Sequence, residues 1–304
     1  MSPNPRTILI VNPTAGHGQG KKCFARLEAR LRREIPDLDV RMSEYAGHAV
    51  ELGRKAAEER APRLICLGGD GTPFEVVNGL YAEGRPAVVP EIGMIPAGTG
   101  NSFLRDFGIA SAEAALDGLL AGKKRAVDLM DFEYRREGRT ERRRALNIIG
   151  VGLIADILKL TNERLKFLGA AGYSLAVLIR LAKGMDNKID LTADGRTWTI
   201  RDSALVVSNS QYTGGKMRIA PMADTADGRA DLVAFREVNR REILAIFKGV
   251  FAGRHTSHPK VEATPGAEIA IDAAPAQILM ADGELLGETP LRLTVRPREL
   301  TILA

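Results

Sequence analysis

Cysteine, aromatic residues and long apolar runs are all scarce in this 304-residue chain. The two cysteines, Cys23 and Cys66, provide neither a disulfide framework nor the spacing of a metal site, so we interpret both as small buried side chains in a reduced compartment. Aromatic residues make up only 5%, which disfavours a platform of stacked rings for single-stranded nucleic acid. No apolar run approaches the roughly 18–20 residues that span a bilayer, and the first residues lack a signal-peptide pattern. We therefore expect a cytoplasmic protein.

The charge balance is basic but modest. Lys and Arg number 43 against 38 Asp and Glu, a net charge of +5, and hydrophobic residues at 45% are enough for a packed core. A basic balance favours a polyanionic partner, which could be a nucleotide, an anionic lipid surface or a nucleic acid. Only the charge supports nucleic acid, so we expect no nucleic-acid partner.

The first part of the chain alternates between two periodicities. Apolar runs typical of buried strands alternate with segments whose apolar residues recur at helical spacing. The predicted strands are 7–11, 39–44, 63–68 and 91–96, and the predicted helices are 20–35, 47–59 and 73–81. This alternation predicts βαβ units and a parallel sheet, and such sheets bind ligands at the carboxyl ends of their strands.

The pattern changes near Lys124. The segment "RREGRTER" separates two apolar segments and predicts a β-hairpin. Short strand-like segments separated by turn signals such as "ADG" follow it, and two helical stretches, 153–183 and 239–251, interrupt them. The second part is therefore predicted to be mostly antiparallel β structure.

The stretch "GGDGT", residues 68–72, stands where a predicted strand gives way to a helix. Glycine lets the backbone turn sharply and approach a phosphate, and the N–H groups at a helix start bind anions. A carboxylate repels phosphate, so Asp70 makes sense there only if Mg²⁺ or a hydroxyl lies between them. A simple tight turn is the alternative interpretation.

Two further glycine-rich turns follow predicted strands. One lies in "IPAGTGNSF", residues 95–103, and the other in "IVNPTAGHGQGKK", residues 10–22. The second does not have the Walker spacing G-x-x-x-x-G-K-[ST]. Three such turns at one sheet edge indicate a nucleotide site.

The segments "VNPTAG", "GGDGTPFEVVNGL", "PAGTGNSF" and "ADGE" occur in this order. Together they resemble the diacylglycerol kinase catalytic-domain family, which includes soluble bacterial diacylglycerol kinases, sphingosine kinases and ceramide kinases. The resemblance covers essentially the whole chain. It implies a phosphofructokinase/NAD-kinase-like nucleotide-binding α/β domain at 1–128, joined by the C-terminal strand 294–304. A mostly antiparallel β-sandwich domain with inserted helices, residues 129–293, would take the lipid substrate.

The resemblance also implies roles for matching residues. Asp70 would organise Mg²⁺ through water, and a carboxylate of "ADGE", Asp282 or Glu284, would deprotonate the acceptor hydroxyl. The sequence does not decide between these two, and an Asp-Gly hairpin turn is the plainer interpretation of "ADGE". The residues expected to hold ATP are Asn12, Pro13, Thr14, Ala15, Gly16, Ser43, Gly68, Gly69, Asp70, Gly71, Thr72, Glu75, Gly98, Thr99, Gly100 and Asn101.

A second metal site is implied within "IAPMADTADGRADL", residues 219–232. Asp227 would bind a structural Mg²⁺ through its side chain, with the backbone carbonyls of Asp224 and Arg229 nearby. The alternative is an ordinary Asp-Gly turn. One departure from the family concerns Ser102, which stands where its members usually have Asp or Ala, and this weakens the inferred Mg²⁺ network and the assignment of the acceptor.

These observations lead to the hypothesis of an ATP-dependent lipid kinase acting on a primary hydroxyl, with diacylglycerol favoured over a sphingoid base or ceramide. An NAD kinase-like enzyme and an inactive nucleotide- or lipid-binding module are the alternatives. We expect peripheral association with an anionic membrane surface, with the basic run 135–144 either docking on head groups or simply solvated. The apolar stretch 157–185 is expected to be core helix or an acyl-chain pocket, and a homodimer is a further expectation.

Overall fold

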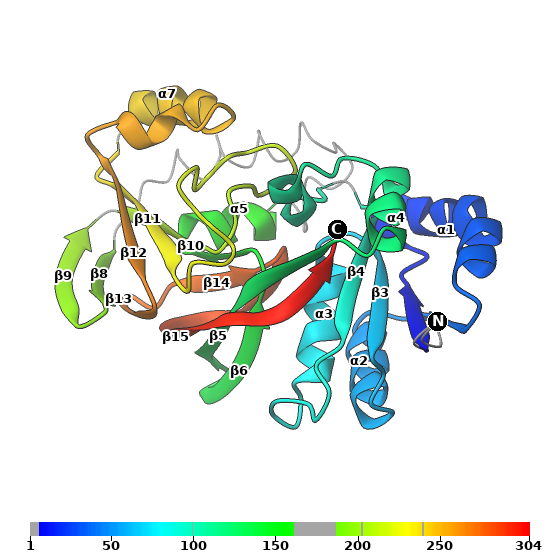
Figure 1. Ribbon diagram of the computed structural model, residues 1–304. Coiled ribbons are helices and arrows are strands. Elements are labelled where there is room, and N and C mark those ends of the chain that lie inside the picture. The colour runs from blue at the N-terminus through cyan, green and yellow to red at the C-terminus, as the bar shows by residue number, and fades with distance from the viewer. Residues whose placement is uncertain (1–5, 99, 161–186, 202, 239) are drawn as a thin grey trace. The chain divides into compact units, whose positions relative to one another are not determined.

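The computed structural model describes residues 6–98, 100–160, 187–201, 203–238 and 240–304 (Figure 1). The chain divides into two compact units. Unit 1 comprises Met1–Val127 with Arg298–Ala304, and unit 2 comprises Asp128–Pro297. Two long strands, β5 and β15, contribute residues to both units.

The elements of unit 1 alternate as the sequence pattern predicts. They are β1 (Thr7–Val11), α1 (Ala15–Glu34), β2 (Leu38–Met42), α2 (His48–Glu58), β3 (Arg63–Gly68), α3 (Gly71–Leu80), β4 (Glu91–Pro96), η1 (Phe103–Phe107) and α4 (Ala112–Leu120). The elements that follow are β5 (Lys124–Arg136), β6 (Arg139–Ala145), β7 (Ile148–Val151), α5 (Leu153–Leu160), β8 (Lys188–Ala193), β9 (Arg196–Arg201), β10 (Ser203–Ser208), β11 (Ala230–Arg236), α7 (Arg240–Val250), η4 (Arg254–Ser257), β12 (Val261–Gly266), β13 (Glu268–Ala274), β14 (Ile278–Ala281) and β15 (Glu284–Leu303).

A parallel sheet forms the centre of unit 1. β1 pairs with both β2 and β3, β3 pairs with β4, and all of these pairings are parallel. The end of β15 adds a further parallel strand, with Thr301–Leu303 opposite Glu91–Gly93. β1, β3 and β4 are largely apolar because helices cover both faces of such a sheet, and all five residues of β1 are buried, whereas the edge strand β2 is only partly buried. The predicted parallel α/β architecture is confirmed.

Close helix packing in unit 1 depends on small residues. A Cβ at Gly53 of α2 would lie 2.4 Å from the carbonyl oxygen of Val76, and one at Gly79 of α3 would lie 2.0 Å from that of Val50. The two helices can therefore touch backbone to backbone. The first helix departs from the prediction of 20–35, because α1 begins at Ala15 and includes left-handed residues at 16–18.

Unit 2 is mostly antiparallel β structure. β10 pairs with β7 and β11, β11 with β12, and β14 with β7 and β15. β13 pairs with β15 and β8, while β5 and β6 form the predicted hairpin. The predicted helix at 239–251 corresponds to α7. The helix predicted at 153–183 is described only in its first part, as α5. Residues 161–186, which include most of the predicted acyl-pocket stretch, lie outside the described residues. None of the described helices is long and apolar enough to cross a membrane.

Candidate active site

The three glycine-rich turns meet at one edge of the unit 1 sheet. They follow β1, β3 and β4, which are neighbouring parallel strands (Figure 1). A Cβ at Gly16 would lie 2.5 Å from the carbonyl oxygen of Ala97, and one at Gly98 would lie 2.5 Å from the Cα of Gly69. Real Cβ atoms do not approach so closely, so only glycine lets the three turns touch. The sequence prediction that these turns converge is confirmed by this contact.

Asn12 connects the first turn to the second. Its Oδ1 accepts hydrogen bonds from the backbone N–H and the hydroxyl of Thr14, at 3.1 and 2.9 Å. Its Nδ2 donates to Thr72 Oγ1 at 3.4 Å. Thr72 is itself buried, and Gly68 leaves room for it, since a Cβ at Gly68 would lie 2.1 Å from that hydroxyl oxygen. Pro13, Ala15 and Gly16 complete this partly exposed turn.

Asn101 holds the third turn closed. Its Oδ1 accepts the N–H of Gly98 at 3.1 Å, and its Nδ2 donates to the Gly98 carbonyl at 2.6 Å. Asn101 adopts a left-handed backbone conformation with φ of 47°, which Asn tolerates better than most residues. Gly100 precedes it in the same turn, and Thr99 lies outside the described residues.

Asp70 reaches across this edge from the second turn to the third. Although it occupies the N-cap position of α3, its side chain does not cap that helix. Its two carboxylate oxygens instead accept the N–H of Ser102, at 3.0 and 2.8 Å. Burial raises the pKa of Asp70, while hydrogen bonds from Ser102 and Phe103 and the charge of Arg105 oppose that rise. A nearby cation would therefore favour the ionised carboxylate.

The oxygen chemistry of Asp70 suits Mg²⁺. Among the described residues there is no group of three or more His, Cys, Asp or Glu that could hold a metal. Mg²⁺ at phosphoryl-transfer sites is commonly held by one or two carboxylates together with substrate phosphates and water. The single carboxylate of Asp70, beside the glycine-rich turns, fits that pattern.

Two other predicted nucleotide residues make structural contacts. Ser43 is buried, and its N–H donates to the Val11 carbonyl at 2.8 Å, which ties the segment after β2 to the end of β1. The carboxylate of Glu75 accepts the N–H groups of Gly47 and Ala49 at the start of α2, while burial raises its pKa. Glu75 thus caps a neighbouring helix, a contact that the sequence pattern does not reveal.

Tyr45 is a candidate that sequence reasoning missed. Its ring is 54% exposed just after Ser43, and it stacks on His48 with centroids 4.5 Å apart and planes 5° from parallel. The Tyr45 hydroxyl donates to Glu51 at 2.8 Å, and His48 Nδ1 accepts the N–H of Glu44. The exposed ring is therefore held in a fixed orientation. The available signal was an aromatic residue in the turn after an edge strand, two residues before Gly47.

In unit 2 the "ADGE" segment forms the turn of the β14–β15 hairpin. Asp282 and Gly283 adopt left-handed conformations, as the Asp-Gly turn predicts. Asp282 is buried, and its carboxylate accepts three backbone N–H groups, those of Leu146, Asn147 and Ile148, at 2.8–3.0 Å. Glu284 is exposed. The two carboxylates of the motif therefore differ sharply in their surroundings.

The segment proposed for a structural metal contains two side-chain turns. Asp224 Oδ1 accepts the N–H of Ala226 at 3.0 Å, and Asp227 Oδ1 accepts that of Arg229 at 2.9 Å. Burial and the charge of Asp227 raise the pKa of Asp231 to about 6. The positive charge of Arg229 opposes this rise, so a cationic side chain already lies near these two carboxylates.

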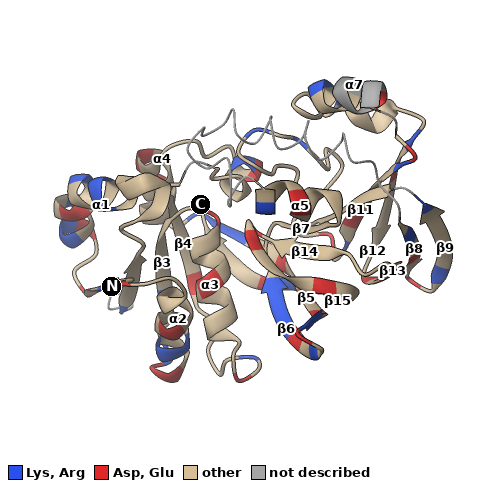
Figure 2. Cartoon of the chain, turned by 180° about the vertical axis from the view of Figure 1, so that it is seen from behind, with Lys and Arg blue, Asp and Glu red and all other residues tan. Residues whose placement is uncertain are grey.

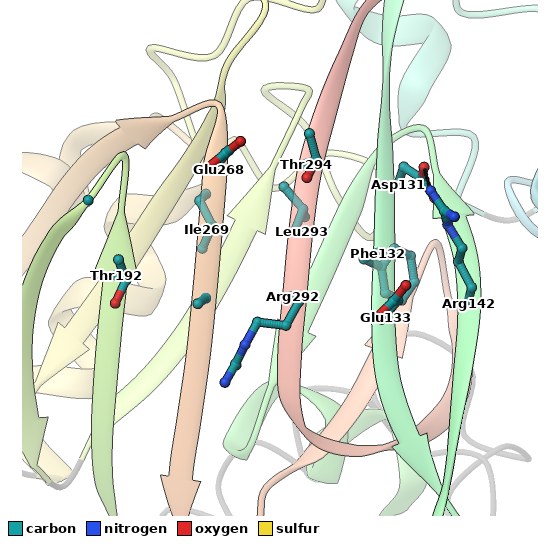
Figure 3. Close-up of a pocket in the computed structure, with 12 residues that line it drawn as sticks. Asp131, Phe132, Glu133, Arg142, Thr192, Glu268, Ile269, Arg292, Leu293 and Thr294 are labelled. Atoms are coloured by element: carbon teal, nitrogen blue, oxygen red, sulfur yellow. Dashed lines mark hydrogen bonds and ion pairs between the residues drawn. The ribbon is translucent and has the colours of Figure 1, made fainter.

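A pocket of about 440 Å³ lies in unit 2 apart from every predicted site residue (Figure 3). Charged and apolar side chains from β5, β6, β8, β13 and β15 line it. Arg142 points at Asp131 along one wall (Figure 3). Arg144 and Arg296 also pair with Asp131, and Arg136 and Arg143 pair with Glu141. These five arginines share two carboxylates, so the ion pairs neutralise only part of the basic charge seen on β6 in Figure 2.

Comparison with known proteins agrees with this geometry. Residues 6–132 match the diacylglycerol kinase catalytic domain, and residues 147–304 match the YegS C-terminal NAD kinase beta sandwich-like domain. The chain is therefore a kinase by family. It belongs to the diacylglycerol kinase catalytic-domain family, as the motifs predict.

Individual relatives are similar over nearly their whole length. A diacylglycerol kinase of Bacillus subtilis (strain 168) is 27% identical over 289 residues, covering 94% of this chain and 91% of the relative. A diacylglycerol kinase of Mycobacterium tuberculosis (strain ATCC 25618 / H37Rv) is 26% identical, covering 98% and 94%. A crystal structure of a diacylglycerol kinase from Bacillus anthracis str. Sterne superposes with a TM-score of 0.77 at 24% identity, covering 100% of this chain and 98% of that one. Yeast NADH kinase complexed with NADH shares the fold, with a TM-score of 0.53 at 11% identity over 99% of this chain and 83% of that one.

Proposed function

We propose that this protein is an ATP-dependent lipid kinase that phosphorylates the primary hydroxyl of diacylglycerol to give phosphatidic acid. The observation that carries the proposal is the contact of three glycine-rich turns at one sheet edge, with Asp70 joining two of them. The names of the relatives support the lipid as acceptor. Unit 1 would bind the nucleotide and unit 2 the lipid.

The turns would hold the phosphates through backbone N–H groups. At the start of α3 the N–H of Thr72 donates to the Gly69 carbonyl and Pro73 has no N–H, so the N–H of Gly71 would contact a phosphate bound at this helix start. Asp70 would hold Mg²⁺ through water, and the cation would neutralise phosphate charge when bound. The hydrogen bonds from Ser102 fix the direction in which the Asp70 carboxylate faces.

For the proton of the acceptor hydroxyl, we propose Glu284 as the base. In the transfer, the hydroxyl oxygen forms a bond to the γ-phosphorus, the bond to the β,γ-bridging oxygen breaks, ADP leaves and the proton passes to the base. Three backbone donors already engage the Asp282 carboxylate, whereas Glu284 is exposed. Asp282 would then position residues 146–148.

The base of the nucleotide would stack on Tyr45. β3, β1 and β2 are successive neighbours, and adjacent strands are about 4.8 Å apart, so the ends of β3 and β2 are separated by about 10 Å. A ribose bridges a gap of this order between phosphates at β3 and a base at β2. Tyr45→Ala is expected to weaken ADP binding about ten-fold, since base–aromatic stacking contributes about 1–3 kcal/mol. Binding of inorganic triphosphate, which has no base, is the control and should not change.

The deciding experiment is transfer of radiolabelled phosphate from ATP with Mg²⁺ in mixed micelles. Diacylglycerol, sphingosine, ceramide and monoacylglycerol are presented separately, with Asp70→Asn as the control variant. Label in diacylglycerol that the variant loses is the expected result. Label in a sphingoid base or ceramide alone would show that this lipid, and not diacylglycerol, is the acceptor. Intact ATP binding with no label in any lipid would indicate an inactive binding module.

NAD is added as a further acceptor, because yeast NADH kinase shares the fold. Label in NAD and in no lipid would reverse the assignment. The structural metal is measured separately, by the effect of Mg²⁺ on the unfolding temperature of wild type and Asp227→Ala. We propose that Mg²⁺ raises this temperature in the wild type and not in the variant.

A further inference from the structure

One surface of unit 2 combines exposed apolar side chains with basic ones. Among the described residues, the large apolar side chains exposed in unit 2 are Met222, Phe251 and Leu285, at 44%, 52% and 37%. Met222 and Phe251 lie in two segments, 216–224 and 246–257, that pack on each other. Burying such side chains is favourable, so an ordered exposed pair suggests a surface that meets another apolar phase.

Specific contacts hold these two segments together. The N–H of Arg218 donates to the Val250 carbonyl at 3.0 Å, and His255 Nε2 lies 2.9 Å from the Ile219 carbonyl oxygen. A Cβ at Gly253 would lie 3.1 Å from the Cβ of Pro221, the neighbour of Met222. The segments that carry the two apolar side chains therefore pack together at the end of α7.

The core beneath fixes this arrangement. Met217, Ile219, Ala220, Ile246 and Val250 belong to one buried cluster. Phe251 meets the partly buried Phe247 edge to face, with centroids 5.6 Å apart. Phe251 is thus supported on one side and open on the other.

The surrounding charge is positive. The segments 216–224 and 246–257 contain four Lys or Arg residues and one acidic residue, Asp224. Lys216, Lys248 and Arg254 are exposed, and none forms an ion pair with another described residue. The basic run on β5 and β6 differs, since Arg142, Arg143 and Arg144 all have acidic partners.

We propose that Met222 and Phe251, together with Lys216, Lys248 and Arg254, form a docking surface for an anionic bilayer. Aromatic and apolar side chains would enter the head-group region while the three cations contact anionic lipid. The inference rests on the proposed lipid kinase function, because the acceptor would be embedded in that bilayer. It also places docking at a surface where Lys216, Lys248 and Arg254 have no ion-pair partner among the described residues, whereas Arg142, Arg143 and Arg144 of the hairpin are held by acidic side chains.

The test measures binding of the full chain to vesicles by flotation, at low and moderate salt. Vesicles of phosphatidylcholine alone are compared with vesicles that contain phosphatidylglycerol. The variants are Phe251→Ser and the pair Lys248→Glu with Arg254→Glu. Arg139→Glu, an exposed basic residue at the start of β6, is the matched charge control. Circular dichroism and the unfolding temperature confirm that each variant is folded.

We expect the wild type to prefer anionic vesicles and to lose binding as salt rises. The double variant Lys248→Glu with Arg254→Glu should bind more than ten-fold more weakly, because each basic residue at an anionic surface contributes about 1 kcal/mol, or about five-fold in affinity. Phe251→Ser should reduce binding about ten-fold, and Arg139→Glu should stay within about two-fold. The proposal would be overturned if both docking variants bound vesicles as tightly as the wild type. It would also be overturned if the wild type showed no preference for anionic vesicles.

Activity separates this proposal from the kinase function. If docking is right, the variants should keep wild-type transfer to a short-chain diacylglycerol dispersed in detergent and lose transfer to the same lipid in vesicles. Vesicle binding that depends on Phe251, with no transfer to any lipid, would support docking and refute the proposed function. Self-association that is lost in Phe251→Ser, without vesicle binding, would instead identify a second copy of the chain as the occupant and overturn the membrane assignment.

Discussion

The backbone N–H of Ser102 donates to both carboxylate oxygens of Asp70, at 3.0 Å to Oδ1 and 2.8 Å to Oδ2. Asp70 ends the turn after β3, and Ser102 ends the turn after β4. One carboxylate thus joins two of the three turns at the sheet edge. The backbone donor persists when the side chain at position 102 changes, whereas the hydrogen bond from the Ser102 side chain to Asp70 is lost.

Substitutions at Ser102 separate its two contributions. Ser102→Ala keeps the backbone donor and should reduce stability by only about 1 kcal/mol. Ser102→Asp places a carboxylate in a site that is 1% exposed beside Asp70, and should cost about 2 kcal/mol or more without a cation. Thermal unfolding with and without Mg²⁺ and ADP measures both effects. When both ligands are present, Ser102→Asp should recover part of the stability that it loses. A Ser102→Asp variant as stable as the wild type without ligands would contradict this account.

A methyl group at Gly98 should separate the second and third turns. The new Cβ would lie 2.5 Å from the Cα of Gly69, so the backbone must move. Gly98→Ala is expected to weaken ADP binding by about ten-fold or more, because misplaced backbone donors lose charge-assisted hydrogen bonds of about 1.5–3 kcal/mol. Calorimetry of ADP binding measures the loss.

Gly108→Ala serves as the control for a change at glycine. A Cβ there meets nothing within 4 Å, and its positive φ of 73° costs about 1–2 kcal/mol of strain. This variant should lower stability and leave ADP affinity unchanged. Similar ADP affinities in the two variants would argue against a role for the turn contact.

The two carboxylates of "ADGE" should respond differently to substitution. Asp282→Ala leaves the N–H groups of Leu146, Asn147 and Ile148 buried without their acceptor, at about 1–3 kcal/mol for each. We expect unfolding or severe destabilisation. Glu284→Gln should keep the wild-type unfolding temperature and lower kcat about 100-fold or more, as loss of a general base does.

The measurement is a thermal melt paired with steady-state kinetics on the same preparations. A stable Asp282→Asn variant with no turnover, beside an active Glu284→Gln variant, would exchange the two roles. Binding of ADP should be normal in Glu284→Gln, which distinguishes a lost base from a damaged nucleotide site.

Local sequence signals predicted the parts of the site that depend on local chemistry. Gly68 is required by its contact with nearby Thr72, and Gly16 and Gly98 by contacts with other turns; a glycine-rich turn after a strand marks all three in the sequence. β1, β3 and β4 were equally readable, because strands buried on both faces are largely apolar runs. The start of α1 was missed, because residues 16–18 have left-handed backbone conformations and carry no apolar residues at helical spacing.

Contacts between distant residues could not be predicted in the same way. Asp282 accepts hydrogen bonds from residues 146–148, which precede it in the chain by 134 to 136 positions. Glu75 caps α2 from α3, which requires knowing how the helices pack. The pairing of arginines on the hairpin with Asp131 likewise follows from strand register, which the composition of a basic run does not specify.

The last prediction concerns Asp131, whose carboxylate lies among three arginines. Arg142 binds it through two nitrogens, and Arg144 and Arg296 lie 3.6 and 3.4 Å away. Burial alone would raise the pKa of Asp131, but the hydrogen bond and charge of Arg142 and the charges of the other two arginines outweigh it, so the pKa is lowered. The unfolded chain then binds a proton at higher pH than the folded one. The contribution of Asp131 is complete above the ordinary aspartate pKa and is lost as pH falls through the lowered folded value.

Asp131→Asn should therefore cost about 2 kcal/mol near neutral pH, below the usual 3–5 for a broken buried pair because Arg142 and Arg296 are half exposed. The variant should also lose less stability than the wild type as pH falls from about 5 to 3. Urea unfolding at several pH values gives both quantities. Asp272→Asn, which removes an exposed partner of Arg292, should barely change either one. Parallel pH curves for Asp131→Asn and wild type would show that the arginines do not hold this carboxylate in its ionised form.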